Sequence, residues 1–202
     1  LIQNAYNSPW LNNMKFSEDI SQILNRRVMC ENDANCFALS ESFDGSAKNY
    51  RIVFGIILGS GCGGGLVINK KILVGPNFLA GEWGHIPLGL INEKNNIQEH
   101  ISGKGLERIY LKKYKKKLTA EEIFLKSKDR SSVEYNFTKD FLENLGLSLS
   151  ILINIIDPDA IVFGGGVSNS IESLDEVKKL TEKYLKSFNN LNKLNLKTVF
   201  LK

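Results

Sequence analysis

Residues 51–65, RIVFGIILGSGCGGG, decide the fold of this chain of 202 residues. Arg51 to Leu58 is a continuous run of β-branched and other apolar residues, which is typical of a strand covered on both faces. Five glycines then occupy the seven positions from Gly59 to Gly65. Glycine lets the backbone approach a ligand closely and point successive N–H groups at an anion, so the run favours a phosphate site. A tight hairpin turn is the alternative interpretation.

Two common nucleotide-binding motifs do not match this run. No Gly-Lys-Ser/Thr follows the glycines, so it is not a P-loop. The glycines also lead to a second predicted strand and not to a helix, which excludes the dinucleotide fingerprint. Residues 66–68 and 71–74 flank Asn69-Lys70 and predict a hairpin with a tight turn.

A second glycine cluster ends the segment DPDAIVFGGG, residues 157–166. Ala160 to Phe163 predicts a short buried strand that enters Gly164 to Gly166. Backbone at such a turn can pack against a flat ring or face a phosphate at a helix start, and a plain helix–strand–helix connection is the alternative. Two glycine clusters at strand ends of one sheet favour a nucleotide site for both.

Strands and helices alternate along the rest of the chain. Apolar periodicity predicts helices over residues 14–25, 35–42, 106–114, 120–127, 138–156 and 175–188, and further strands over 27–30 and 198–201. This order indicates a mixed α/β domain with its ligand at the carboxyl edge of the strands.

Composition excludes several classes of protein. A hydrophobic content of 43% excludes intrinsic disorder. The formal charge of +4 is concentrated in Lys112 to Lys117, which is too local for a nucleic-acid-binding face. No apolar run approaches the roughly 20 residues needed to span a bilayer, so we expect no membrane contact and a cytoplasmic location. The cysteines Cys30, Cys36 and Cys62 show no C-x-x-C spacing, so neither a zinc site nor a disulfide framework is expected.

Four polar residues are candidates for chemistry. Asp33 follows Asn32 at a predicted strand-to-helix junction, where it could accept a proton from a substrate hydroxyl or simply cap the helix. Glu82 and His85 stand three residues apart behind Gly81, and the imidazole could bind a metal, orient a sugar hydroxyl or be an ordinary loop histidine. A metal is disfavoured because no cysteine lies nearby. Glu99 could be a sugar ligand or a surface acid.

Together these segments resemble the ROK sugar kinases in order and spacing. The resemblance covers nearly the whole chain and rests on residues 31–35 (ENDAN), 58–66 (LGSGCGGGL), 80–85 (AGEWGH), 102–103 (SG) and 157–168 (DPDAIVFGGGVS). Within that family, NDANCFALSE at residues 32–41 is most similar to the bacterial N-acetylglucosamine kinases.

The resemblance implies an actin-like, ribonuclease H-type fold, with residues 1–50 completing the N-terminal lobe and residues 51–202 forming the nucleotide-binding lobe. It implies transfer of the γ-phosphoryl group of ATP, with Mg²⁺, to the 6-hydroxyl of N-acetyl-D-glucosamine, and relatives suggest a homodimer. A kinase for glucose, fructose or N-acetylmannosamine, a non-catalytic sugar-sensing module and a truncated remnant are the alternatives.

The resemblance also assigns roles to individual residues. Asp33 corresponds to the catalytic base. The sugar ligands correspond to Asn32, Glu82, His85 and Glu99. The second phosphate motif corresponds to Gly59, Ser60, Gly61, Gly63 and Gly64, and the adenosine motif corresponds to Gly164, Gly165 and Gly166.

Three departures from the family pattern stand out. The first phosphate motif is absent, and the chain starts without Met, so we expect a fragment or a shortened relative. The cysteine-rich zinc loop is replaced by LINEKNNIQ at residues 90–98, which contains no cysteine, so we do not expect bound zinc. The chain also stops before the usual closing helix of the family.

Overall fold

The computed structural model describes residues 8–88, 95–189, 194 and 196–202. Contacts divide the chain into two compact units, a first unit of residues 1–32 and a second unit of residues 33–202. The boundary between residues 50 and 51 that the resemblance implies differs from this division by contacts, and it stays a prediction.

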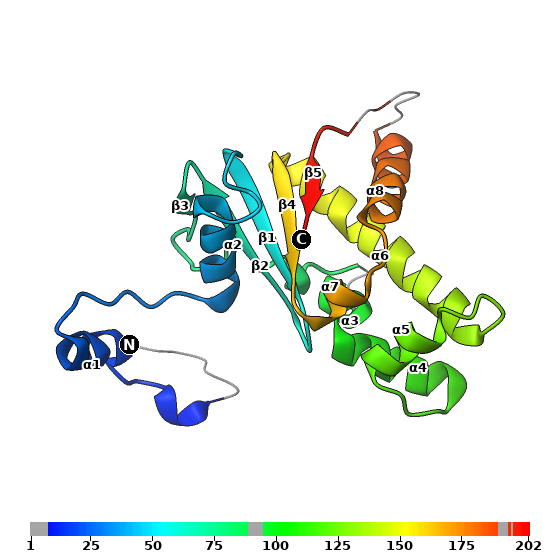
Figure 1. The fold of residues 1–202 in the computed structure, drawn as a ribbon, viewed down its shortest axis with the longest axis horizontal. Helices are drawn as coiled ribbons and strands as arrows, with labels where there is room; N and C mark the ends of the chain where they lie inside the picture. The colour runs from blue at the N-terminus through cyan, green and yellow to red at the C-terminus, as the bar shows by residue number, and fades with distance from the viewer. Residues whose placement is uncertain (1–7, 89–94, 190–193, 195) are drawn as a thin grey trace. The chain divides into compact units, whose positions relative to one another are not determined.

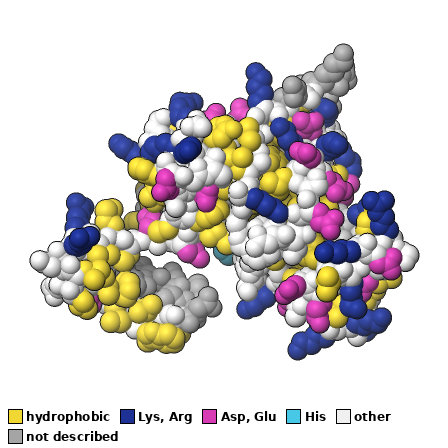
Figure 2. Space-filling view, viewed as in Figure 1, with side chains coloured by type: hydrophobic (Ala, Val, Ile, Leu, Met, Phe, Trp, Pro, Cys, Tyr) yellow, Lys and Arg dark blue, Asp and Glu magenta, His cyan; other side chains and the backbone are white. Residues whose placement is uncertain are grey.

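The first unit contains a short 3₁₀ turn, η1 (Pro9–Leu11), and one helix, α1 (Phe16–Leu24). The strand predicted over residues 27–30 is wrong. The Val28 N–H donates to Ser21 Oγ at 2.8 Å, and the Val28 carbonyl accepts from the hydroxyl of Ser17, so α1 satisfies the backbone that a neighbouring strand would pair with. Large apolar side chains of this unit are exposed, among them Met29 at 79%, and Figure 2 shows hydrophobic surface on its face.

The second unit is built on a five-stranded sheet in the order β3-β2-β1-β4-β5. The strands are β1 (Ile52–Leu58), β2 (Cys62–Ile68), β3 (Lys71–Ile72), β4 (Ala160–Gly164) and β5 (Val199–Leu201). The β1–β2 and β2–β3 pairs are antiparallel, whereas β4 is parallel to both β1 and β5. The predicted hairpin at Asn69-Lys70 is confirmed, and both residues adopt positive φ there. β2 begins at Cys62, earlier than predicted, so Gly63, Gly64 and Gly65 lie inside a strand.

The five helices predicted for the second unit are confirmed, with ends shifted by a few residues, as α2 (Asp33–Phe43), α4 (Gly103–Tyr114), α5 (Ala120–Lys126), α6 (Val133–Ile156) and α8 (Leu174–Phe188). The structure adds the short helices α3 (Ile97–Ile101) and α7 (Gly166–Ser170) and the 3₁₀ turn η2 (Trp83–His85), for which no range was predicted. α6 starts earlier than predicted because Ser132 caps it, its side chain accepting from the Tyr135 N–H. None of the helices within the described residues is both long and apolar enough to cross a bilayer.

Glycines on one face of the sheet let α2 approach it closely. A methyl group added to Gly55 would lie 2.7 Å from the Ala38 Cβ, and one added to Gly65 would lie 2.5 Å from the Ala34 carbonyl oxygen. Larger side chains such as Phe54 and Phe163 belong to the larger apolar core, which the other face of the sheet forms with α6 and α8. Figure 1 shows α2 on one side of the sheet and α6 and α8 on the other. The second unit is therefore a three-layered α/β/α arrangement.

A buried hydrogen bond ties α4 to α6. The Tyr110 hydroxyl donates to Glu134 Oε1 at 2.6 Å, and the Tyr110 side chain is fully buried. Burial, followed by this bond, raises the pKa of Tyr110 to about 12. The same hydrogen bond lowers the pKa of the Glu134 carboxyl below its usual value.

Candidate functional site

Asp33 lies at the carboxyl edge of the parallel strands β1 and β4. The next residue, Ala34, contacts Gly63 and Gly65 near the start of β2, whereas the Ser42 carbonyl, near the other end of α2, accepts from Lys70 in the β2–β3 turn. α2 therefore runs antiparallel to β1, and its N-terminus is at the edge where β1 ends. Asp33 is exposed there, and its Oδ1 accepts from the Ala34 N–H at 2.9 Å.

The turn of residues 59–61 joins β1 to β2 at this edge, and the corner between α3 and α4 holds it. The Gly103 N–H donates to the Gly59 carbonyl at 2.8 Å, and the Lys104 N–H donates to the Ser60 carbonyl at 3.3 Å. The Cys62 N–H donates to Gln98 Oε1 at 3.1 Å. Two backbone bonds and one side-chain bond thus attach the turn to the corner.

A cavity of about 770 Å³ opens beside this turn. It is lined by Gly59, Ser60, Gly103, Lys104, Glu107, Thr119, Ala120, Glu121, Gly166, Val167, Asn169 and Ser170. Cavities of roughly 300 to 1,000 Å³ hold small-molecule ligands and cofactors, so this one has room for a nucleotide. Both predicted glycine clusters contribute to its wall, as their positions at strand ends indicated.

At Gly59 and Gly166 the backbone lines this cavity without a side chain. A methyl group added to either would meet none of the described atoms within 4 Å, and neither has a φ that favours glycine. Gly165 differs, because its φ is 90° and a methyl group would lie 2.4 Å from the Leu58 carbonyl oxygen. A methyl group on Gly164 would lie 2.8 Å from the Phe37 ring. The fold thus accounts for glycine at residues 164 and 165, but not at residues 59 and 166.

Packing also accounts for Gly63 and Gly64. A methyl group on Gly63 would lie 3.2 Å from the Ala34 Cβ, and one on Gly64 would lie 2.6 Å from both the Gly81 carbonyl oxygen and the Trp83 ring. Of the predicted phosphate motif, Gly59 and Ser60 are the residues that line the cavity.

Glu82 and His85 project from a loop that is anchored to β2. The Trp83 Nε1 donates to the Gly63 carbonyl at 3.2 Å, and Trp83 is only 4% exposed. Glu82 Oε2 lies 3.5 Å from His85 Nε2, with side chains 42% and 66% exposed. Gly64 faces this loop whereas Gly63 faces α2, so Glu82 and His85 approach the strand edge from the side opposite to Asp33.

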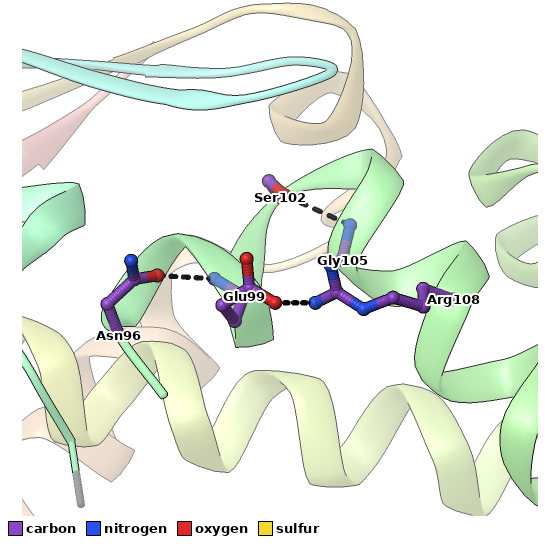
Figure 3. Close-up of polar contacts among 5 residues, drawn as sticks. All are labelled: Asn96, Glu99, Ser102, Gly105 and Arg108. Atoms are coloured by element: carbon purple, nitrogen blue, oxygen red, sulfur yellow. Dashed lines mark hydrogen bonds and ion pairs between the residues drawn. The ribbon is translucent and has the colours of Figure 1, made fainter. Parts of the chain in front are cut away.

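Glu99 does not line the cavity beside the turn. Its carboxylate forms an ion pair with Arg108, and its N–H donates to Asn96 Oδ1 at 3.1 Å (Figure 3). Both Glu99 and Arg108 line a different cavity, of about 710 Å³, against α6. The residue that faces the glycine turn is its neighbour Gln98, which sequence reasoning missed. No local pattern in the sequence distinguishes Gln98 from Glu99, because only the packing of α3 directs one of them to the turn.

The structure does not place the remaining predicted residue, Asn32, relative to the cavity. Asn32 ends the first unit, where its N–H donates to Glu31 Oε1 at 2.8 Å, so its part in the site stays a prediction. Most of the segment that replaces the zinc loop lies outside the described residues. Within the described ranges, no three His, Cys, Asp or Glu side chains are grouped so as to hold a metal ion.

Comparisons with known proteins identify a family and a fold for this chain. The model of the ROK family matches residues 1–199. The chain is 37% identical over 185 residues to an N-acetyl-D-glucosamine kinase from Histophilus somni, covering 83% of this chain and 59% of that protein. The chain therefore spans little more than half the length of this curated relative.

Two solved structures share the fold. A ROK family protein from Streptococcus pneumoniae in complex with sucrose superposes with a TM-score of 0.86 at 23% identity, over 100% of this chain and 68% of that chain. A ROK family glucokinase from Streptomyces griseus in complex with glucose and AMPPNP gives a TM-score of 0.74 at 24% identity, over 92% and 66%. The fold is thus the actin-like fold of the ROK sugar kinases.

Proposed function

Because the chain belongs to the ROK family, we propose that it forms the nucleotide-binding part of an ATP-dependent hexose kinase. The proposed reaction is phosphorylation of the 6-hydroxyl of N-acetyl-D-glucosamine. One observation carries the proposal. A cavity large enough for a nucleotide opens at the sheet edge that also carries Asp33, and two glycines in its lining, Gly59 and Gly166, are not required by packing.

The cavity supports MgATP as the phosphoryl donor. Magnesium enters with the nucleotide as part of this substrate, held mainly by phosphate oxygens and water. At Gly59 and Gly166 the backbone can approach the nucleotide without an intervening side chain. Phosphoryl transfer depends mainly on positioning and on neutralisation of charge, and the anchored turn of residues 59–61 provides positioning.

Asp33 is the proposed general base. Its carboxylate is exposed at the same edge as the turn, where an acceptor sugar can reach it. As the sugar hydroxyl attacks the γ-phosphorus, the carboxylate takes the hydroxyl proton and the bond to the β-phosphate oxygen breaks. The products are the sugar 6-phosphate and ADP.

Glu82 and His85 are the proposed sugar ligands. Both are exposed polar groups on a loop whose buried Trp83 holds them in place, and together they can donate to and accept from ring hydroxyls. Asn32 remains a candidate next to Asp33 in the chain. The choice of N-acetyl-D-glucosamine over other hexoses follows the name of the relative from Histophilus somni. A cytoplasmic, homodimeric enzyme is part of the same proposal.

The decisive experiment replaces Asp33 with Ala in the full-length protein. Loss of a general base lowers turnover by roughly 10² to 10⁴-fold. We expect that loss in an assay coupled to ADP release, with sugar affinity by calorimetry nearly unchanged. Asp44→Ala is the matched control, because Asp44 is an exposed acid just beyond the other end of α2.

The same assay on the unaltered full-length protein separates the alternatives. Turnover supports a kinase, and comparison of N-acetylglucosamine, glucose, fructose and N-acetylmannosamine identifies the acceptor. Sugar binding without ADP release would indicate a sensing module, and the absence of both would indicate a remnant. An Asp33→Ala variant with near-normal turnover would refute the assignment of the base.

A further inference from the structure

Lys104 is a positively charged residue in the lining of the nucleotide cavity. It is the second residue of α4, which Ser102 caps by accepting from the Gly105 N–H at 3.1 Å. Its backbone N–H donates to the Ser60 carbonyl, so its side chain starts from backbone that is attached to the glycine turn. The side chain is exposed and lines the cavity together with Gly59 and Gly166.

The charges around the cavity single out this residue. Among its lining residues in the described part of the chain, Lys104 is the one Lys or Arg, and Glu107 and Glu121 are the acids. Glu107 Oε1 accepts from the Ala120 N–H at 3.0 Å, which fixes that carboxylate at the start of α5. Two carboxylates repel a nucleotide phosphate chain, so a positive group is needed where the phosphates lie.

We propose that the Lys104 ammonium group binds the β- and γ-phosphates of the nucleotide and stabilises the charge that moves onto the leaving ADP. This inference rests on the proposed kinase function. A Lys ammonium is a compact point charge that suits phosphate. The tie between the Lys104 backbone and Ser60 places it beside the bare turn, where glycine leaves room for the phosphates. Lys104 is then a further catalytic residue, because it contacts the transferred group.

A purely solvated role for Lys104 is the competing interpretation. Lys104 also lines a second hollow of about 500 Å³ with Arg108 and Lys117. Basic side chains gather over the part of the surface that α4 and α5 form (Figure 2), and residues 112–117 belong to the same basic stretch. If Lys104 is only part of this basic surface, replacing its side chain should not change the affinity of the protein for a nucleotide.

The test compares Lys104→Met, Lys104→Arg and the control Lys112→Met in the full-length protein. Lys112 is an exposed lysine two turns further along α4, outside the lining of the nucleotide cavity. Calorimetry with MgATP, MgADP and AMP measures affinity, and ADP release measures turnover. Because Lys104 is exposed, all variants should melt at the temperature of the unaltered protein.

We expect Lys104→Met to weaken MgATP binding tenfold or more, to weaken MgADP less and to leave AMP unchanged. Turnover falls as well, Lys104→Arg restores part of both, and Lys112→Met changes neither. Equal MgATP affinity and turnover in Lys104→Met and the unaltered protein would overturn this inference and leave the kinase proposal intact. An unaltered protein that binds no nucleotide would overturn both.

Discussion

Replacing Gly64 with Ala tests whether the glycines of β2 serve packing or ligand binding. The added methyl group would lie 2.6 Å from the Gly81 carbonyl oxygen, 2.6 Å from Trp83 Cδ1 and 2.8 Å from Phe54 Cζ. Two of these atoms belong to the loop that carries Glu82 and His85. The loop must therefore move away from the strand, and the hydrogen bond from Trp83 to the Gly63 carbonyl lengthens or breaks.

The expected cost follows from these contacts. Overpacking a core position costs roughly 1 to 3 kcal/mol, and losing a hydrogen bond adds about 1 kcal/mol. A total of about 3 kcal/mol corresponds to a fall in Tm of roughly 6 to 12 °C for a domain of this size. Displacement of Glu82 and His85 should also raise KM for the sugar more than KM for MgATP.

Thermal denaturation followed by circular dichroism measures the fall in Tm, and the coupled assay measures both KM values. Gly166→Ala is the matched control for stability, since its methyl group meets none of the described atoms within 4 Å. Its Tm should change by less than about 2 °C, while its affinity for MgATP falls. Equal Tm values for Gly64→Ala and the unaltered protein would show that packing does not require glycine at this position.

Three further predictions concern a buried acid, a surface acid and the side chain that anchors the glycine turn. Tyr110→Phe leaves Glu134 without its hydroxyl donor and should cost about 1 to 3 kcal/mol in urea denaturation at pH 7. Because the folded pKa of Glu134 lies below the usual 4.5, this stabilisation exists above pH 4.5 and disappears as the pH falls through the folded pKa, so the two proteins should converge in stability in acid. Glu99→Gln breaks an ion pair with a largely exposed Arg108 and should lower the free energy of unfolding in urea by at most about 1 kcal/mol. Gln98→Ala should raise KM for MgATP, since the Cys62 N–H loses its acceptor.

Much of the fold could be predicted because it depends on local patterns. Arg51 to Leu58 is apolar at nearly every position, which a buried strand requires, and the start of α5 carries a capping box of Thr119 and Glu122. The strand predicted at residues 27–30 failed for a non-local reason. The short apolar run was correct, but Ser17 and Ser21 satisfy its backbone, and no strand pairs with it in the described part of the chain.

The candidate site could be predicted only in outline. The position of glycine runs after strands indicated the sheet edge, and Asp33 and both turns do lie there. The sequence could not predict which of Gln98 and Glu99 faces the turn, because neighbouring residues on a helix point in different directions. Only the packing of α3 directs Gln98 to the turn and Glu99 to Arg108.

Apart from residues 27–30 and the short helix α3, the order of strands, helices and glycine turns was determined by the sequence alone, since periodicity and turn residues act over a few positions. Which glycines are required by packing, and which leave open space, was decided by the tertiary structure. The reason is that the sequence does not tell which atoms a methyl group at each glycine would meet. At residues 64, 65, 164 and 165 it would meet backbone or a side chain, whereas at residues 59 and 166 it would point into open space.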